Sequence, residues 1–164
     1  MKGIYILLGS NLGDRETILR NALEEIEKHC GSILSTSSFY ESAAWGKHEQ
    51  PDFLNQAIEL ESELSPLDLL EKLQMIESSM GRERYIKWGE RKIDIDILYY
   101  GELIRKTDRL VLPHPEIPNR KFTLLPLLEI ATDFRHPVNN LTQKQLLDRC
   151  PDPLWVRKYK SVVY

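Results

Sequence analysis

Hydrophobic and polar positions along this chain follow two periods, which predicts both strands and helices. Four segments are short apolar runs or alternate strictly, as β-strands do: 2–8, 33–40, 53–60 and 92–100. Two longer segments repeat apolar residues every three or four positions, as one face of a helix does: 15–30 and 66–80. Asp14 and Ser65 stand at their N-cap positions, and a glycine follows each end.

The resulting order of strand, helix, strand, strand, helix, strand predicts an α+β fold, a ferredoxin-like βαββαβ sandwich. Additional C-terminal helices are expected across 124–130 and from Thr142, where Gln145 completes a capping box. Neither a linker nor an internal repeat interrupts the chain, so we expect residues 1–164 to form a single domain.

Composition narrows the functional classes. Hydrophobic residues make up 41% and charged residues 29%, as in globular proteins, and the net charge of −3 disfavours general nucleic-acid binding. No apolar run is long enough for a membrane span or a signal peptide, and the two cysteines lie far apart. We therefore expect a cytoplasmic monomer that binds neither a membrane nor nucleic acid.

The most distinctive local feature is Asp94-Ile95-Asp96. Residues two apart in a strand share a face, so both carboxylates project together, ~7 Å apart, while the flanking isoleucines face the other way. Such a pair suits Mg²⁺, which takes one or two carboxylates together with substrate phosphates and water. The alternative is a solvated strand face that carries acids.

The segment before this strand is basic. Residues 81–92 hold five cations against two acids, a local charge of +3 in an acidic chain. Arginine suits bidentate recognition of phosphate, and two glycines make the segment pliable. Beside the carboxylates it is predicted to be a phosphate-binding lid, although taken alone it also fits a mobile surface loop.

Other residues could complete a site for a polyphosphate and a flat ring. Prolines stiffen the chain around His114 and Arg120, although most loop histidines are simply surface residues. Asn55 could read the donors and acceptors at a ring's edge. Four aromatic residues could stack on the ring or belong to the core: Trp45, Phe53, Trp88 and Phe122. No P-loop is present, so the residues indicate a magnesium-dependent enzyme that binds a polyphosphate by another route.

Several motifs occur together in a characteristic order and spacing. The central one is the stretch 88–97, Trp-Gly-Glu-Arg-Lys-Ile-Asp-Ile-Asp-Ile. The others are Gly9-Ser10-Asn11-Leu12, Ser38-Phe39-Tyr40, the segment 50–55, Gly81-Arg82, Pro113-His114 and the segment 119–122. From about residue 2 to past residue 130, the chain resembles the 6-hydroxymethyl-7,8-dihydropterin pyrophosphokinase family.

This resemblance implies transfer of the terminal pyrophosphoryl group of ATP to the hydroxymethyl group of the pterin, with release of AMP, in folate biosynthesis. By position, Asp94 and Asp96 would ligate two Mg²⁺ ions. Arg82 and Arg91 would cover the phosphates, and these four residues are the expected catalytic set. The expected ATP-binding residues are Gln74, Glu77, Arg82, Arg84, Trp88, Arg91, Ile97, Arg109, His114 and Arg120. The expected pterin-binding residues are Ser42, Ala43, Trp45, Phe53, Asn55, Trp88 and Phe122.

The chain departs from the family pattern in three places. Ala43-Ala44 replaces prolines, Phe53 stands where tyrosine is common, and Val111 stands where a threonine can touch ATP. These changes affect individual substrate contacts rather than the expected reaction. No general base is evident, so metal-bound and solvent-assisted proton transfer are both open.

Two other classes of protein fit the same fold. An RNA-binding module would display aromatic residues on its central strands, but here Asp94 and Asp96 would repel a nucleic-acid backbone. A non-catalytic sensor of small molecules would explain neither the aspartate pair nor the basic segment. Formation of AMP from ATP and the reduced pterin distinguishes the enzyme from both.

Overall fold

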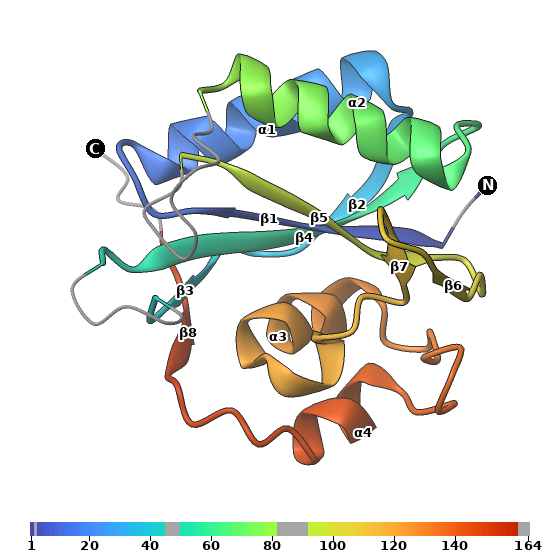
Figure 1. Cartoon of the computed structure of the whole chain (residues 1–164). Coiled ribbons are helices and arrows are strands. Elements are labelled where there is room, and N and C mark those ends of the chain that lie inside the picture. The colour runs from blue at the N-terminus through green and yellow to red at the C-terminus, as the bar shows by residue number, and fades with distance from the viewer. Residues whose placement is uncertain (2, 45–49, 82–91, 161–164) are drawn as a thin grey trace.

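A computed structural model describes residues 1, 3–44, 50–81 and 92–160. In these parts, one antiparallel sheet lies between two helical layers (Figure 1). The strands of this sheet are β1 (Ile4–Ser10), β2 (Ser32–Thr36), β3 (Tyr40–Ser42), β4 (Phe53–Glu61), β5 (Asp94–Tyr100) and β8 (Val156–Lys158). The helices are α1 (Arg15–His29), α2 (Pro66–Ser79), α3 (Lys121–Ile130) and α4 (Gln143–Asp148), with a short 3-10 helix at Ile117–Asn119. A separate hairpin pairs β6 (Arg105–Lys106) with β7 (Val111–Leu112).

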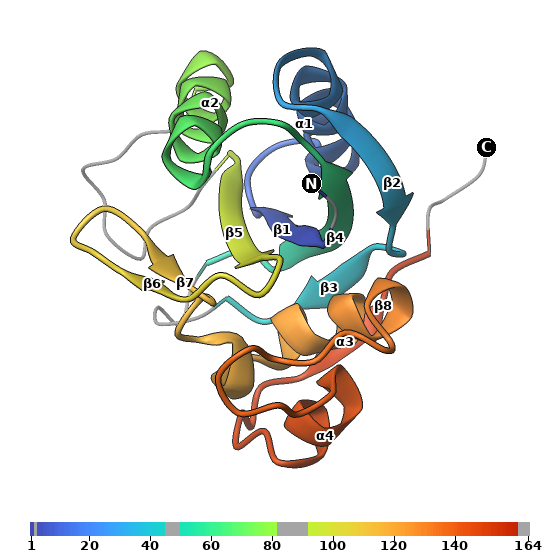
Figure 2. The same ribbon diagram turned by 90° about the vertical axis from the view of Figure 1, so that its right-hand side faces the viewer.

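The strand order in the sheet is β5-β1-β4-β3-β8, and β2 also pairs with β4. Every pairing is antiparallel. Helices α1 and α2 cover one face, and α3 and α4 cover the other (Figure 2). The expected mixture of helices with an antiparallel sheet is therefore present.

Side-chain capping explains where three of the helices begin. Asp14 accepts a hydrogen bond from the Thr17 backbone N–H, as the sequence predicts for the start of α1. Ser65 caps α2 in the same way, with Pro66 as the first helical residue. The predicted capping box is present at α4, where Thr142 and Gln145 satisfy each other's backbone donors.

Two apolar clusters hold the layers together, one on each face of the sheet. Ile95 and Ile97 belong to the cluster beneath α1 and α2. Leu7, Ala57 and Leu98 belong to the cluster beneath α3 and α4. Because side chains alternate along a strand, Asp94 and Asp96 share the face of Leu98, opposite the isoleucines. The predicted division of this strand into two faces is confirmed.

The prediction of one strand over 33–40 is wrong, because Ser37 interrupts it. The Ser37 hydroxyl accepts a hydrogen bond from the Ala57 backbone N–H, and the Gln56 side chain donates to the Ser37 carbonyl. The Ser37 backbone N–H still donates to the Ala57 carbonyl oxygen at 2.8 Å, so side-chain bonds add to the backbone pairing here and the regular ladder ends. Two strands, β2 and β3, therefore pair with successive parts of β4.

The sequence pattern also missed the shortest strands. β6, β7 and β8 are two or three residues long, too short to show a period. In the described ranges no helix is both long and apolar enough to cross a bilayer.

Candidate active site

Three neighbouring strands bring Asn55, Gly9 and Asp94 into one row across the sheet. Gly9 on β1 is in register with Asn55 on β4 and with Asp94 on β5. Neighbouring strands are ~4.8 Å apart, so the backbones of Asn55 and Asp94, two strands apart, are separated by about 10 Å. A β-carbon at Gly9 would lie 3.2 Å from Asn55 Oδ1 and 3.6 Å from Phe53 Cδ1, so glycine keeps this part of the face open.

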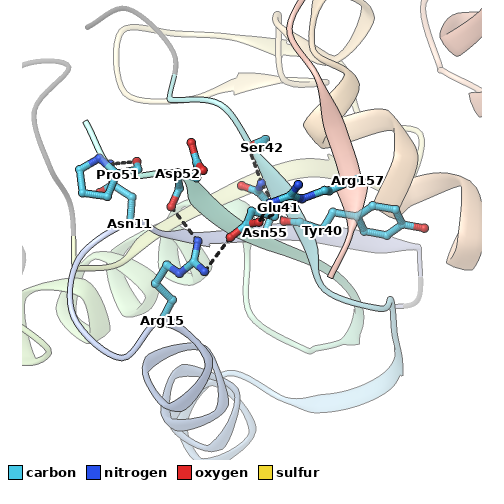
Figure 3. Close-up of polar contacts among 9 residues, drawn as sticks. All are labelled: Asn11, Arg15, Tyr40, Glu41, Ser42, Pro51, Asp52, Asn55 and Arg157. Carbon is cyan, nitrogen blue, oxygen red and sulfur yellow. Dashed lines mark hydrogen bonds and ion pairs between the residues drawn. The ribbon is translucent and has the colours of Figure 1, made fainter. Parts of the chain in front are cut away.

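The amide of Asn55 has a defined orientation. Its buried Nδ2 donates to the carbonyl oxygen of Tyr40 at 3.2 Å and to Ser42 Oγ at 2.8 Å (Figure 3). Both amide hydrogens are therefore directed at β3, and Oδ1 lies on the side of Gly9. The structure thus presents an acceptor to a ring that lies on the sheet face over Gly9.

Asp94 and Asp96 lie at the other end of this row, on the edge strand of the sheet. Both are half-buried, and they project from the same face of β5. Among the described residues, no group of three or more histidine, cysteine or acidic side chains is placed to hold a metal ion. Two hard carboxylate donors suit a magnesium ion whose other ligands come from phosphates and water.

The outer edge of β5 is covered by two residues expected to bind ATP. The buried carboxylate of Glu77 on α2 accepts a hydrogen bond from the Ile95 backbone N–H at 3.0 Å. The His114 backbone N–H donates to the Leu98 carbonyl oxygen at 2.9 Å. Glu77 and His114 therefore lie beside the strand that carries the aspartates.

His114 is neutral near pH 7. Burial lowers its pKa to about 4, with a further lowering by Arg120 and an opposing effect of Glu116 and Asp94. His114 Nδ1 accepts a hydrogen bond from the Glu116 backbone N–H at 3.2 Å, so the neutral ring carries its proton on Nε2. The side chain can thus donate one hydrogen bond without adding charge.

Arg120 supplies a positive charge at this end of the site. Its Nε lies 3.9 Å from a carboxylate oxygen of Glu116, and its side chain is largely buried. The guanidinium carbon lies 5.6 Å from the centre of the Phe122 ring. Arg120 and Phe122, predicted for different substrates, are therefore neighbours at the start of α3.

The other expected ATP-binding residues in the described ranges lie along α2 and β5. Exposed Arg109 donates to Glu71 at 3.1 Å, and Gln74 and Glu77 follow at successive i+3 positions. The Ile97 side chain is buried in the cluster beneath this helix, on the face opposite the aspartates. These residues form a strip over the edge of β5 rather than part of the face that carries Asn55.

Two of the expected pterin residues, Ser42 and Phe53, lie beside Asn55 and Gly9. Buried Ser42 is the hydrogen-bond partner of Asn55, Phe53 lies next to Gly9, and the Ala43 backbone N–H donates to the Trp155 carbonyl oxygen at 3.4 Å. Five of the predicted site residues lie outside the described residues: Trp45, Arg82, Arg84, Trp88 and Arg91.

Sequence reasoning missed a set of charged residues on the face of β3 opposite Asn55. Arg15, Glu41 and Arg157 form two ion pairs, each with a 2.7 Å contact. Nearby, Asn11 donates to Gln50 Oε1 at 3.2 Å. Figure 3 shows its second bond, to the Pro51 carbonyl oxygen. The predicted strand ends at residue 40 and leaves Glu41 outside it, and sequence alone does not pair residue 41 with residue 157.

Fold and site together define an α+β protein with a candidate site in two parts, one that carries the Asn55 amide and one that carries the Asp94 and Asp96 carboxylates. Residues 5–132 match the family model described as 7,8-dihydro-6-hydroxymethylpterin-pyrophosphokinase (HPPK). The chain belongs to this family.

Three curated relatives are between 43% and 46% identical to the chain. The 2-amino-4-hydroxy-6-hydroxymethyldihydropteridine pyrophosphokinase of Haemophilus influenzae is 46% identical over 134 residues, covering 81% of this chain and 84% of the relative. The Bacillus subtilis protein of the same name is 44% identical, with 77% of each chain covered. The folic acid synthesis protein FOL1 of Dictyostelium discoideum is 43% identical over 91% of this chain, which spans only 22% of that relative.

Solved structures show the same fold at much lower identity. A Plasmodium falciparum HPPK-DHPS structure superimposes with a TM-score of 0.73 at 18% identity, covering 89% of this chain and 42% of that chain. An HPPK-DHPS complex with substrates gives a TM-score of 0.72 at 17% identity over 88% of this chain, again 42% of the larger chain.

Proposed function

We propose that the chain transfers the terminal pyrophosphoryl group of ATP to the hydroxymethyl group of 7,8-dihydro-6-hydroxymethylpterin, giving AMP and the pterin diphosphate in folate biosynthesis. Family membership supports the reaction. The observation that carries the proposal in this structure is the row Asn55–Gly9–Asp94. In this row the Asn55 amide and the Asp94 carboxylate lie on one sheet face, on strands about 10 Å apart, which supports one substrate at each end.

The pterin is proposed to lie over Gly9, with its polar edge toward β3. Asn55 Oδ1 would accept a hydrogen bond from the ring, because both Nδ2 hydrogens already bond Tyr40 and Ser42. Phe53 and Phe122 would stack on the ring, and the backbone of 42–45 would read its edge. Trp45 and Trp88 are included in this pocket on the family resemblance alone.

Asp94 and Asp96 are proposed to hold two magnesium ions. Their half-buried carboxylates on one face suit a hard divalent cation, and the small number of protein ligands leaves positions for phosphate oxygens. When bound, magnesium neutralises charge on the β- and γ-phosphates during transfer.

The remaining ATP-binding residues are proposed to surround the phosphates and the nucleoside. His114 donates from Nε2, and Arg120 supplies charge on the same side. The strip along α2 and β5 would hold the nucleoside with Gln74, Glu77, Ile97 and Arg109. Arg82, Arg84 and Arg91, from the basic segment 81–92, would cover the phosphates.

Catalysis is then mainly a matter of positioning. The hydroxymethyl oxygen attacks the β-phosphorus and gives up its proton by a metal-bound or solvent-assisted route. A new oxygen–phosphorus bond forms, and AMP leaves with the bridging oxygen. Neutral His114 and cationic Arg120 can hold phosphate oxygens in line without themselves taking the proton. Fixed donors of this kind act where charge shifts as the bond to AMP breaks.

We also propose that the fold is the ferredoxin-like βαββαβ sandwich and that residues 1–164 form one domain. If β2 and β3 are counted together as the second strand, β4 is the third and β5 the fourth. The strand order across the sheet is then fourth, first, third, second, which supports this class. A cytoplasmic monomer that uses only small-molecule substrates is part of the same proposal.

Asp94→Ala and Asp96→Ala provide the test, in an assay that measures AMP formed from ATP and the reduced pterin at saturating magnesium. Each variant should lose at least two orders of magnitude in rate, since each removes a metal ligand. Exposed Asp133→Ala, with the same loss of charge, should retain full activity. Near-wild-type rates in either site variant would overturn the metal assignment, and no AMP from the wild-type chain would favour a non-catalytic sensor.

A further inference from the structure

The buried Glu41 carboxylate on β3 joins α1 to β8, and Arg15 extends this contact to the residue before β4. Arg15, the first residue of α1, donates from Nη2 to Glu41 Oε2 at 2.7 Å and from Nη1 to the Asp52 carbonyl oxygen at 2.9 Å. From β8, Arg157 donates to Glu41 Oε1 from both Nη2 and Nε, at 2.7 and 3.2 Å. Figure 3 shows Arg15 reaching both Asp52 and Glu41. We call Arg15, Glu41 and Arg157 the Glu41 clamp.

The clamp is built as a charged cluster and not as an exposed surface pair. The Glu41 side chain is only 12% exposed, whereas Arg157 is 69% exposed and Arg15 is 22% exposed. Burial alone would raise the Glu41 pKa, but hydrogen bonds from Arg157 and Arg15 outweigh it and lower the pKa. Glu41 is therefore ionised near neutral pH and paired with two guanidinium groups.

Glu41 lies between the two residues that orient the Asn55 amide. Tyr40 supplies a carbonyl oxygen and Ser42 a hydroxyl to Asn55 Nδ2. Asp52, held by Arg15, directly precedes Phe53 at the start of β4. The clamp thus fixes, from the opposite face, both strands that carry the ring-reading residues.

The C-terminal strand extends this support. β8 pairs Arg157 with Glu41 and Val156 with Ser42 in antiparallel register. The Trp155 carbonyl oxygen accepts from the Ala43 backbone N–H, and the Arg157 guanidinium lies 4.9 Å from the centre of the Trp155 ring. All of β8 lies beyond residue 132, where the match to the family model ends.

We propose that Glu41 is a positioning residue for the pterin subsite, held in place by Arg15 and by Arg157 of the C-terminal strand. It acts through Ser42 and Asn55 and touches neither substrate. The inference rests on the proposed function, because the subsite that it positions is the pterin subsite. Its distinctive consequence is that a residue outside the family-matched region determines affinity for the pterin but not for ATP.

Arg157→Gln and Glu41→Gln test this proposal. The dissociation constant for 7,8-dihydro-6-hydroxymethylpterin is measured with α,β-methylene-ATP and magnesium, and that for the ATP analogue is measured separately. Each variant should weaken pterin binding roughly five- to tenfold through lost charge-assisted hydrogen bonds, with ATP affinity and the rate at saturating pterin within about twofold of wild type. Arg157→Lys, which keeps the charge, should recover part of the loss. Exposed Arg135→Gln, whose arginine bonds the Asn140 carbonyl oxygen, is the matched control and should change nothing.

Hydrogen exchange of the Ala43 amide, followed without any ligand, provides a second readout. Arg157→Gln should accelerate this exchange, and Arg135→Gln should not. Pterin affinity within twofold of wild type in both clamp variants would overturn the proposal, as would equal losses of pterin and ATP affinity. If the wild-type chain binds no pterin, the proposed function fails, and the exchange rates alone decide whether the clamp holds this strand.

Discussion

The Glu77 carboxylate accepts a 3.0 Å hydrogen bond from the backbone N–H of Ile95, the residue between the two aspartates. β5 is an edge strand, so this N–H has no neighbouring strand to bond. Glu77, expected from the family resemblance only as an ATP contact, therefore also fixes the strand that carries Asp94 and Asp96. A single buried side chain links helix α2 to the proposed metal site.

Glu77→Ala should lower the free energy of unfolding by about 1–3 kcal/mol, because it leaves a buried N–H unsatisfied. Denaturant unfolding measures this change. Glu71→Ala on the same helix is the control. It removes only an exposed ion pair with Arg109 and should cost under about 1 kcal/mol. Equal losses of unfolding free energy in the two variants would show that the Glu77 hydrogen bond stabilises the fold no more than an exposed ion pair does.

Much of the architecture could be predicted from sequence because the relevant signals are local. The cap residues Asp14, Ser65 and Thr142 bond amides three residues ahead, and the alternation around Asp94 and Asp96 needs only the strand period. The break at Ser37 depends instead on partners twenty residues away on β4, so no local pattern reveals it.

The site residues also divide into those that local sequence patterns reveal and those that only the fold brings together. Asn55 and the aspartates stand out as polar residues on predicted strand faces, and motif order assigns their roles by resemblance. The clamp joins residues 15, 41 and 157, which are distant in sequence and come together only through the sheet. The low pKa of His114 likewise depends on burial, which the sequence does not specify.

His114 should make the protein less stable as the pH falls from about 6.5 to about 4. Its folded pKa is depressed to about 4 from an ordinary value of 6.5. In this window the unfolded chain binds a proton that the folded chain does not. The free energy of unfolding therefore decreases as the pH is lowered, by up to about 3 kcal/mol. His114→Asn retains an acceptor for the Glu116 N–H and should flatten the dependence, as measured by denaturant unfolding across this range. An unchanged slope in the variant would contradict the assignment.

Gly9→Ala should weaken binding of the pterin more than binding of ATP. The added β-carbon would lie 3.2 Å from Asn55 Oδ1, which must then shift from its ring-facing position. We expect a loss of roughly tenfold in pterin affinity by titration calorimetry. Ser10→Ala is the control on the same strand, because its buried hydroxyl has no hydrogen-bond partner in the described parts of the chain. Equal effects of the two substitutions would argue against a ring over Gly9.

Substitutions of Asn55, Arg82 and Arg91 should separate binding from catalysis. Asn55→Ala should cost about 1–3 kcal/mol in pterin binding, because it leaves the polar edge of the ring unpaired. Arg82→Ala or Arg91→Ala should lower kcat by roughly two orders of magnitude or more and change pterin affinity far less. Steady-state kinetics with equilibrium binding on the three variants measures the split. Intact pterin affinity in Asn55→Ala, with its loss in an arginine variant, would reverse the assignments.

The products identified by ³¹P NMR test the central claim most directly. The wild-type chain, ATP, magnesium and 7,8-dihydro-6-hydroxymethylpterin should give AMP together with two mutually coupled phosphorus signals of a diphosphate on the hydroxymethyl oxygen. Omission of the pterin or chelation of magnesium should leave ATP intact. Formation of ADP with a pterin monophosphate, or release of free phosphate without a pterin ester, would contradict pyrophosphoryl transfer at this site.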